Sequence, residues 1–231
     1  MFDPRMLVLA GVASTVAGAS FALEFSGAEI ALEYRNNLTA NDSQTALDAS
    51  AALFFGSGFG LQFGIKNADY GPFVAWASGY EMHGTYDVSD RLAVGVFAGQ
   101  EFFGTGTDDA YTYGGIEAAF TSGPASLEVA LSDYSGTSYE ATNFALDGKY
   151  TVSDRMDLVA GYHGNNTSDK VKYAYVGASY MVVDGLDLSA KFGHEDDNGA
   201  NSNILSLGVA YSLGEGVTFR QRSYTDLFPT N

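Results

Sequence analysis

The chain has 231 residues, of which 46% are hydrophobic and 17% are charged. It contains 28 glycines and 15 tyrosines but no cysteine, so disulfide bonds cannot stabilise it. The formal net charge of −17 argues against nucleic acid as a partner, because an acidic chain repels phosphate groups.

The N-terminal segment holds the only long unbroken apolar run, from Met6 to Ala19. It is too short to cross a bilayer as a helix, and small residues, including Ser20 and Ala22, follow it. This pattern is typical of a secretory signal peptide, so we expect residues 1–22 to be removed on export. Cleavage after Ala19 and an uncleaved anchor are the alternatives.

A repeat organises the rest of the chain. The stretch "YDVSDRL" at Tyr86 returns as "YTVSDRM" at Tyr150, and aromatic residues stand before similar turns at intervals of about 31 residues. Each interval contains two segments of alternating polarity, so the repeating unit is a β-hairpin. The aligned aromatic residues are Phe55, Tyr86, Phe120, Tyr150, Tyr180 and Tyr211.

Alternation along the whole chain predicts an all-β protein of about 12 antiparallel strands. The expected strands cover residues 23–35, 44–55, 59–66, 73–87, 91–103, 110–121, 125–134, 139–151, 155–164, 170–182, 186–194 and 203–213. Residues 23–213 would form the barrel, and residues 214–231 a C-terminal strand or tail. Because bacterial single-chain barrels have an even number of strands, we expect a tail that tucks into or beneath the barrel. Fourteen strands, with a further hairpin near residues 67–80, are the alternative.

The two faces of the strands favour a transmembrane up-and-down barrel over a soluble sandwich. One face is apolar and suits lipid, whereas the other carries Gly, Ala, Ser and isolated charges, as an aqueous lumen requires. Tight turns alternate with longer loops rich in Asn, Asp and Gly, which predicts short periplasmic turns and longer extracellular loops. The aligned aromatic residues would then form a girdle at the periplasmic head groups of the outer-membrane lipid.

Three stretches carry a family resemblance: "LEFSGAEIALEYRNN" from Leu23, the "VSDR" corners, and "TFRQRSYTDLFP" from Thr218. With them the chain resembles the porin-like outer-membrane proteins of alphaproteobacteria. The resemblance implies a diffusion channel in the outer membrane of a Gram-negative bacterium, and such porins are commonly homotrimers.

The chain departs from this family at two points. No loop is long enough to form the constriction of larger porins, since the longest expected outer loop runs only from Asn36 to Gln44. The chain also lacks a terminal aromatic residue. The pattern from Ser206 to Leu213 resembles the signal that the barrel-assembly machinery recognises, which would leave the residues after it as a tail.

No residue pattern predicts catalysis, so we expect no enzyme activity, catalytic residue or cofactor. His83 and His163 fall on the lumen face without a nucleophile motif. The acidic stretch after His194, in an expected outer loop, lacks the ligand spacing of a calcium loop, so we expect no metal site there.

The lumen is the candidate functional site, and its expected lining is more acidic than basic. An excess of carboxylates predicts passage of small hydrophilic solutes with a weak preference for cations. A structural or adhesive barrel with a closed lumen is the alternative. Besides Gln62 and Lys66, the expected pore-lining residues are Glu29, Glu33, Arg35, Asp48, Glu81, His83, Glu101, Glu117, Glu128, Asp147, Lys149, Asp157 and Lys191.

Overall fold

The computed structural model describes residues 24–40, 42–56, 58–69, 76–104, 108–136, 140–167 and 170–228. The expected signal peptide lies outside the described residues, and the C-terminal segment is described up to Phe228.

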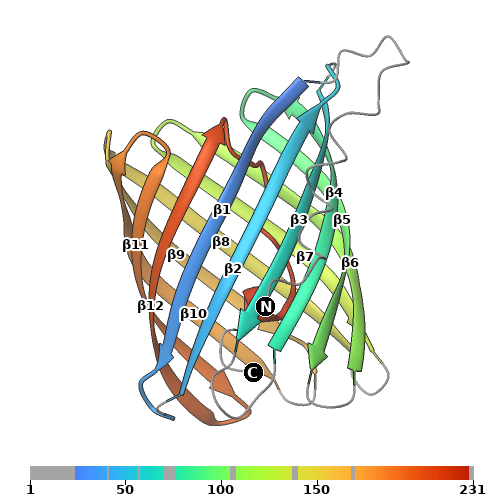
Figure 1. Cartoon of the computed structure of the whole chain (residues 1–231), viewed down its shortest axis with the longest axis vertical. Helices are drawn as coiled ribbons and strands as arrows, with labels where there is room; N and C mark the ends of the chain where they lie inside the picture. Colours follow the sequence, from blue (N-terminus) through green and yellow to red (C-terminus); the bar gives the residue numbers. More distant parts are fainter. Residues whose placement is uncertain are drawn as a thin grey trace, which may run out of the picture.

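Twelve β-strands form one closed barrel, in which every strand is antiparallel to both of its neighbours (Figure 1). Pairing of β1 with β12 closes the barrel, so none of the described strands has an unpaired edge. The strands are β1 Glu24–Asn37, β2 Asp42–Phe54, β3 Phe59–Asp69, β4 Trp76–Ser89, β5 Leu92–Gly104, β6 Asp108–Ser122, β7 Ala125–Ser135, β8 Glu140–Ser153, β9 Met156–Asn165, β10 Val171–Val183, β11 Leu186–Asp197 and β12 Ala200–Gly214.

This architecture confirms the expected antiparallel barrel of 12 strands. The alternative of fourteen is wrong, because residues 76–89 form a single strand, β4. Residues 217–223 form no strand, so the chain after β12 is a tail in its described part. The strands, at 10–15 residues, are long enough to cross a bilayer when tilted.

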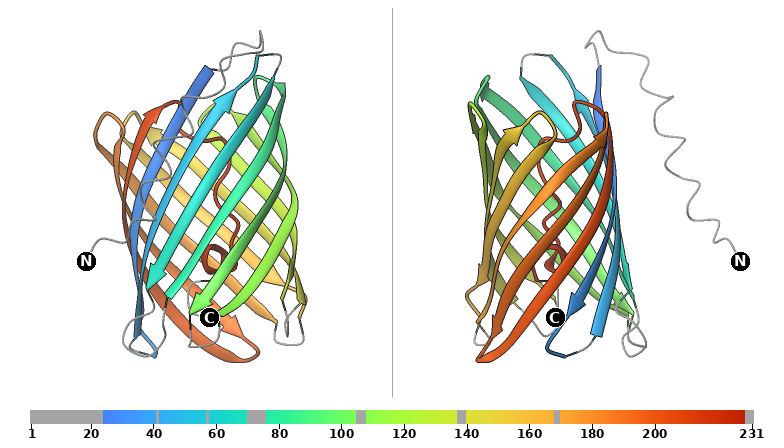
Figure 2. Two further views of the ribbon diagram at one scale, coloured as in Figure 1. Left: turned by 45° about the vertical axis from the view of Figure 1, so that its right-hand side comes forward. Right: turned by 90° about the vertical axis from the view of Figure 1, so that its left-hand side faces the viewer.

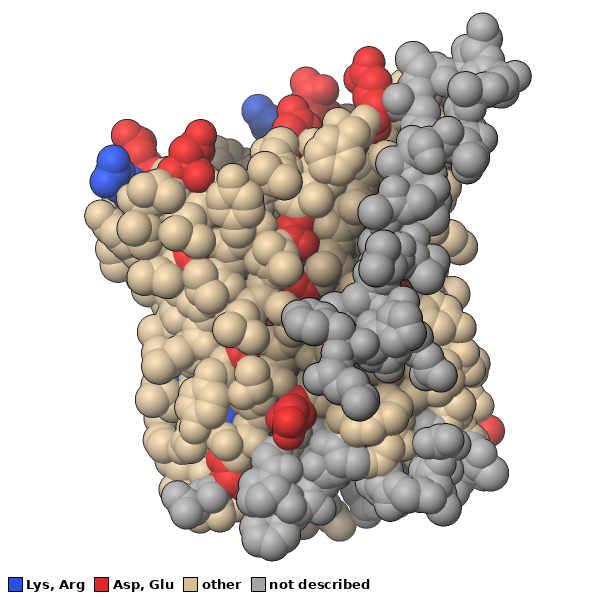
Figure 3. Space-filling model, viewed as in Figure 1, with Lys and Arg blue, Asp and Glu red and all other residues tan. Residues whose placement is uncertain are grey.

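The outward face of the barrel is apolar along each strand. In β12, for example, Leu205, Leu207 and Leu213 are exposed on the outside, whereas the intervening Ser206 is buried inside. Figure 3 shows the consequence on one side of the molecule: charged side chains gather along the upper rim, and uncharged residues predominate on the wall below. A wall of this kind suits contact with lipid.

The repeated "VSDR" stretches form tight corners at one end of the barrel, called here the short-turn end. Ser89 Oγ accepts a hydrogen bond from the backbone N–H of Arg91 at 3.3 Å, and Ser153 Oγ accepts one from Arg155 at 3.4 Å. A register shift precedes each corner, between Asp87 and Ser89 in the first. The repeated sequence is therefore the local sequence signal for a bulged strand end followed by a two-residue turn.

At the opposite end, called here the long-loop end, strands extend into stretches that the sequence predicts as loops. β1 and β2 pair through Asn36 and Ser43, within the loop expected from Asn36 to Gln44, and β3 continues to Asp69. The sequence predicts a polar outer loop after His194, but β11 and β12 continue through this stretch and meet at a turn of Asn198 and Gly199. Both turn residues have positive φ, at 50° and 94°, as a type I′ hairpin requires. The Asn-Gly pair is the local sequence signal for this turn, and it stands within a polar stretch that resembles a loop.

The six aligned aromatic residues all lie close to the short-turn end. Phe55 is half-buried, and the other five side chains are between 40% and 52% exposed on the outer wall. Tyr86 also packs against Phe59 with ring centroids 4.7 Å apart. Their role as a lipid girdle stays a prediction.

The chain after β12 turns inward over the short-turn rim and runs through the barrel to a short helix, α1 Tyr224–Leu227 (Figure 2). Residues 215–228 are called here the tail. Among the described residues, no helix has the length and the apolar character needed to cross a membrane.

Candidate functional site

The interior of the barrel gathers the residues that the alternation assigns to it. The structure buries Arg35, Glu81, His83, Glu101, Glu117 and Asp147 inside, and it places Glu29, Glu33, Asp48, Glu128, Lys149, Asp157 and Lys191 on the wall of an interior cavity. Gln62 and Lys66 also point inward and are buried. That these residues line an open pore stays a prediction.

The tail occupies much of this interior. Phe219, Arg222, Leu227 and Phe228 are each at most 3% exposed, so the tail is packed into the barrel rather than resting on its rim. The sequence leaves open whether residues 214–231 form a thirteenth strand or a tail tucked into or beneath the barrel, and the structure places the described part of this segment inside the barrel as a tail.

Gln62 on β3 holds the start of the buried tail by two hydrogen bonds. Its side-chain amide donates to the carbonyl of Phe219 at 2.6 Å and accepts from the N–H of Phe219 at 3.2 Å. The side chain of Gln221 donates in turn to the carbonyl of Ile65 at 3.1 Å. The ring of Phe219 stacks on His83, with centroids 6.2 Å apart and planes 5° apart.

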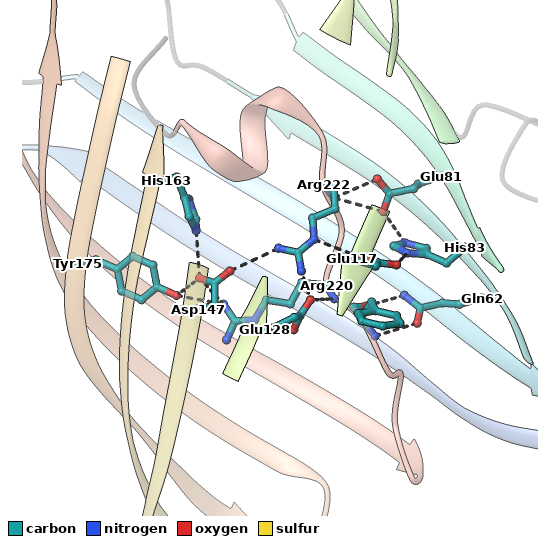
Figure 4. A network of polar contacts seen from close by, with 11 residues as sticks. Gln62, Glu81, His83, Glu117, Glu128, Asp147, His163, Tyr175, Arg220 and Arg222 are labelled. Carbon is teal, nitrogen blue, oxygen red and sulfur yellow. Dashed lines mark hydrogen bonds and ion pairs between the residues drawn. The ribbon is translucent and has the colours of Figure 1, made fainter. Parts of the chain in front are cut away.

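Arg222 lies at the centre of a cage of four carboxylates contributed by β4, β6, β7 and β8 (Figure 4). Nε is 3.5 Å from Glu117, Nη1 is 3.4 Å from Asp147, and Nη2 contacts Glu128. The backbone N–H of Arg222 donates to Glu81 Oε2 at 3.0 Å. We call Glu81, Glu117, Glu128 and Asp147 the carboxylate cage.

The cage is itself tied together by wall residues. His83 bridges two of its members, with one ring nitrogen 2.6 Å from Glu81 and the other 2.6 Å from Glu117. Asp147 accepts a hydrogen bond from Tyr175 at 2.6 Å and lies 3.0 Å from His163. Burial disfavours the charged guanidinium, but the surrounding carboxylates outweigh this effect and raise the pKa of Arg222.

Arg220 lies beside the cage rather than inside it. Its guanidinium donates to Tyr175 Oη at 3.2 Å and is 3.8 Å from Asp147, and its side chain is 47% exposed to the cavity. Solvent therefore screens Arg220 much more than Arg222, which is 1% exposed.

A second anchor fixes the far part of the tail. Lys66 on β3 is buried and pairs with Asp226, and the carbonyl oxygen of Leu227 lies 2.9 Å from a ring nitrogen of His163. Asp226 also accepts hydrogen bonds from the N–H and the hydroxyl of Ser223, at 3.2 and 2.6 Å, which caps α1. Burial would raise the pKa of Asp226, but Lys66 outweighs it and lowers that pKa.

Inward-facing aromatic rings close around the end of the tail. The ring of Tyr134 stacks between those of Tyr111 and Tyr113, with centroid distances of 5.4 and 5.6 Å. Tyr173 stacks on Tyr175 with centroids 5.6 Å apart. Leu227 and Phe228 belong to the same apolar cluster. These rings are not among the expected lining residues, which are charged, amide or histidine side chains, although their position in the alternation places them inside.

Beside the tail a cavity of about 570 Å³ remains, lined by both charge signs. Lys191 pairs with Glu33 at 2.8 Å, Arg35 also pairs with Glu33 at 2.5 Å, and Lys149 lies 3.7 Å from Asp157. Because many of the wall charges are paired, the field in this cavity is weaker than the excess of acids alone suggests.

The fold has counterparts among solved structures. No protein-family model and no curated protein sequence matches the chain. Structural similarity links it to a KdgM porin, with a TM-score of 0.60 at 14% identity over 80% of this chain and 99% of that one. The KdgM porin in complex with disordered oligogalacturonate gives 0.63 at 14% identity, with the same coverage.

The NanC porin gives a TM-score of 0.67 at 8% identity, over 80% of this chain and 100% of that one. Identities this low speak for the fold and not for the solute. The chain has the fold of a porin-like outer-membrane β-barrel.

Proposed function

We propose that the chain is an outer-membrane channel for passive diffusion of small hydrophilic solutes, with a weak preference for cations. The observation that carries the proposal is the cavity of about 570 Å³ beside the tail, whose wall carries charged side chains, inside a barrel whose outer wall is apolar. Water and small hydrophilic solutes suit this cavity, because the charged side chains on its wall can form hydrogen bonds with them.

The likeness to solved porins supports the proposal at the level of the fold. One of those structures is a porin in complex with oligogalacturonate, an oligosaccharide, which belongs to the hydrophilic class of solutes proposed here. The proposal places the chain in the outer membrane of a Gram-negative bacterium after removal of residues 1–22. It includes insertion by the barrel-assembly machinery and a homotrimer, and it assigns no enzyme activity.

Acidic residues on the cavity wall support the cation preference. Glu29 and Asp187 face the cavity, where water and salt reach them. The Debye length is about 8 Å at physiological salt, so the preference is modest there and grows as ionic strength falls.

A second function is favoured by a specific observation, namely the tail and the aromatic cluster that fill part of the interior. A barrel closed in this way would serve as a structural or adhesive protein. The two functions differ in conductance, because a closed barrel passes no ions.

Planar-bilayer recording of refolded full-length protein tests the proposal. We expect discrete conductance steps, and under a salt gradient we expect a reversal potential of the sign for cation flow. Absence of steps from protein that migrates as a folded barrel would favour the closed barrel instead. A clear anion preference would contradict the charge argument and would point to Arg220 as the dominant charge in the cavity.

A further inference from the structure

The carboxylate cage is filled by a group that comes from outside the barrel wall. Arg222 belongs to the tail, whereas Glu81, Glu117, Glu128 and Asp147 belong to four different strands. The tail reaches the cage from the short-turn rim, after Gly214 and Gly216, both with positive φ, near 70°. The wall and its cationic occupant are therefore separate parts joined by a glycine-containing turn.

The wall alone leaves this cage with an excess of negative charge. Its basic neighbours on the strands are His83, between Glu81 and Glu117, and His163, beside Asp147. Buried carboxylates are costly unless a cation or hydrogen-bond donors compensate them. If the tail leaves, these carboxylates must be compensated by water that enters the barrel, by protons or by another cation.

The geometry of the cage favours a guanidinium over an ammonium or a metal ion. The three side-chain nitrogens of Arg222 face three separate carboxylates, which a planar group with several N–H donors can satisfy at once. An ammonium is a compact point charge and cannot span them equally well. Among the described residues, no group of His, Asp and Glu side chains is close enough to hold a metal ion.

We propose that the carboxylate cage is a binding site for guanidinium cations, that Arg222 occupies it as a tethered intramolecular ligand, and that a free guanidinium solute takes the site when the tail withdraws. A flexible tether alone would give Arg222 an effective concentration in the millimolar range. The contacts of Gln62 with Phe219 and of Lys66 with Asp226 hold the tail further, so free ligand competes poorly with the docked Arg222. The role of the site in selecting solutes rests on the proposed channel function, whereas binding itself does not.

Chemical rescue of a full-length Arg222→Ala variant tests the site. The removed side chain leaves room for guanidinium ion, which serves as the probe at roughly 1–20 mM, the range of the tether's effective concentration. Binding is measured by calorimetry on refolded protein, and withdrawal of the tail is measured as tryptic cleavage after Arg220. We expect the variant to bind guanidinium at least tenfold more tightly than the wild type, and we expect the ion to slow cleavage at least fivefold.

Two matched variants make the result specific. Arg220→Ala removes a similar charge from a half-exposed position and keeps Arg222 in the cage, so guanidinium should not alter tryptic cleavage after Arg222 in this variant. Arg222→Ala combined with Glu117→Gln and Glu128→Gln removes two carboxylates from the cage and should lose the rescue. Methylammonium at the same concentrations should rescue Arg222→Ala at least fivefold less effectively than guanidinium.

Equal rescue by methylammonium, or equal guanidinium binding by the wild type and Arg222→Ala, would overturn the proposal. Should Arg222→Ala fail to refold, Arg222→Lys tests the same point, because it keeps the charge and loses the planar group. We then expect faster cleavage than in the wild type, and cleavage at the wild-type rate contradicts the assignment. If the wild-type protein shows no conductance but guanidinium still rescues Arg222→Ala, the channel proposal fails and the guanidinium-binding site stands.

Discussion

Asp226→Asn should release the tail from the barrel, because it breaks the buried ion pair with Lys66. The Lys66 side chain is 1% exposed, and the next acid, Asp48, is 3.8 Å away and already on the wall. Removing one partner of a buried pair costs about 3–5 kcal/mol. Because Asp48 still neutralises part of the charge, we take the low end, about 3 kcal/mol, which is about a 100-fold change in the docking equilibrium.

Limited proteolysis measures this change directly. Trypsin cleaves after Arg220 and Arg222, and Arg222 is protected by burial while the tail is docked. When the tail closes faster than trypsin cuts, the cleavage rate follows the open population. We therefore expect cleavage of Asp226→Asn to be about 100-fold faster than cleavage of the wild type, under conditions in which both rates are measurable.

The matched control is Lys149→Met. Its ion pair with Asp157 spans 3.7 Å, but the lysine side chain is 50% exposed, so solvent screens it and its loss costs about 0–1 kcal/mol. Cleavage should then change less than about fivefold. If Asp226→Asn were cleaved within threefold of the wild-type rate, the Lys66 pair would not anchor the tail and the reasoning would be refuted.

Three further results are expected. Refolded protein should migrate differently on a gel before and after boiling, since every strand of the closed barrel is paired, and identical migration would contradict the barrel. Gly27→Val should abolish the folded band, because a Cβ atom at this position would clash with the backbone of Gly216 and lie 2.7 Å from the carbonyl oxygen of Leu213. In the control Gly84→Ala, the new Cβ contacts only the Val96 side chain, at 3.6 Å, so this variant should fold normally. Conductance of the full-length protein should be constant from pH 8 to about 5 and rise below about 4, because docking lowers the pKa of Asp226 from its ordinary 3.8. The contribution of Asp226 to docking is complete above pH 3.8 and is lost as the pH falls through the lower docked pKa, so the tail leaves the barrel in acid. A flat conductance profile down to pH 3 would be contrary evidence.

The barrel could be predicted from sequence because its determinants are local. Alternation fixes which face each residue takes, and the repeated corners at Ser89 and Ser153 mark where strands end. The same alternation assigns Glu81 and Asp147 to the interior, where both are buried. Errors arose where a turn signal was hidden in a polar stretch, as at Asn198 and Gly199.

A tail tucked into or beneath the barrel could be expected from the sequence, but its contacts could not, because they join residues far apart in the chain. Gln62 binds Phe219, and Glu81 binds Arg222, in each case across more than a hundred residues. Nothing in the local sequence of the tail reports these partners. One indirect signal existed: the inward carboxylates outnumber the inward bases, and the tail offers two arginines, Arg220 and Arg222, close together.

The balance between wall acids and tail arginines leads to a final prediction, on selectivity. Arg222 is neutralised inside the carboxylate cage, so the tail charge that acts on the cavity is that of the half-exposed Arg220. Replacing Arg220 with Gln removes this charge and leaves Arg222 in place, so the cation preference should increase. The increase should be larger at about 0.05 M salt than at about 0.5 M, because screening weakens the field of exposed charges. Reversal potentials measured at both salt concentrations test this expectation. A lower cation preference in Arg220→Gln would mean that the wall acids near the cavity do not control the field.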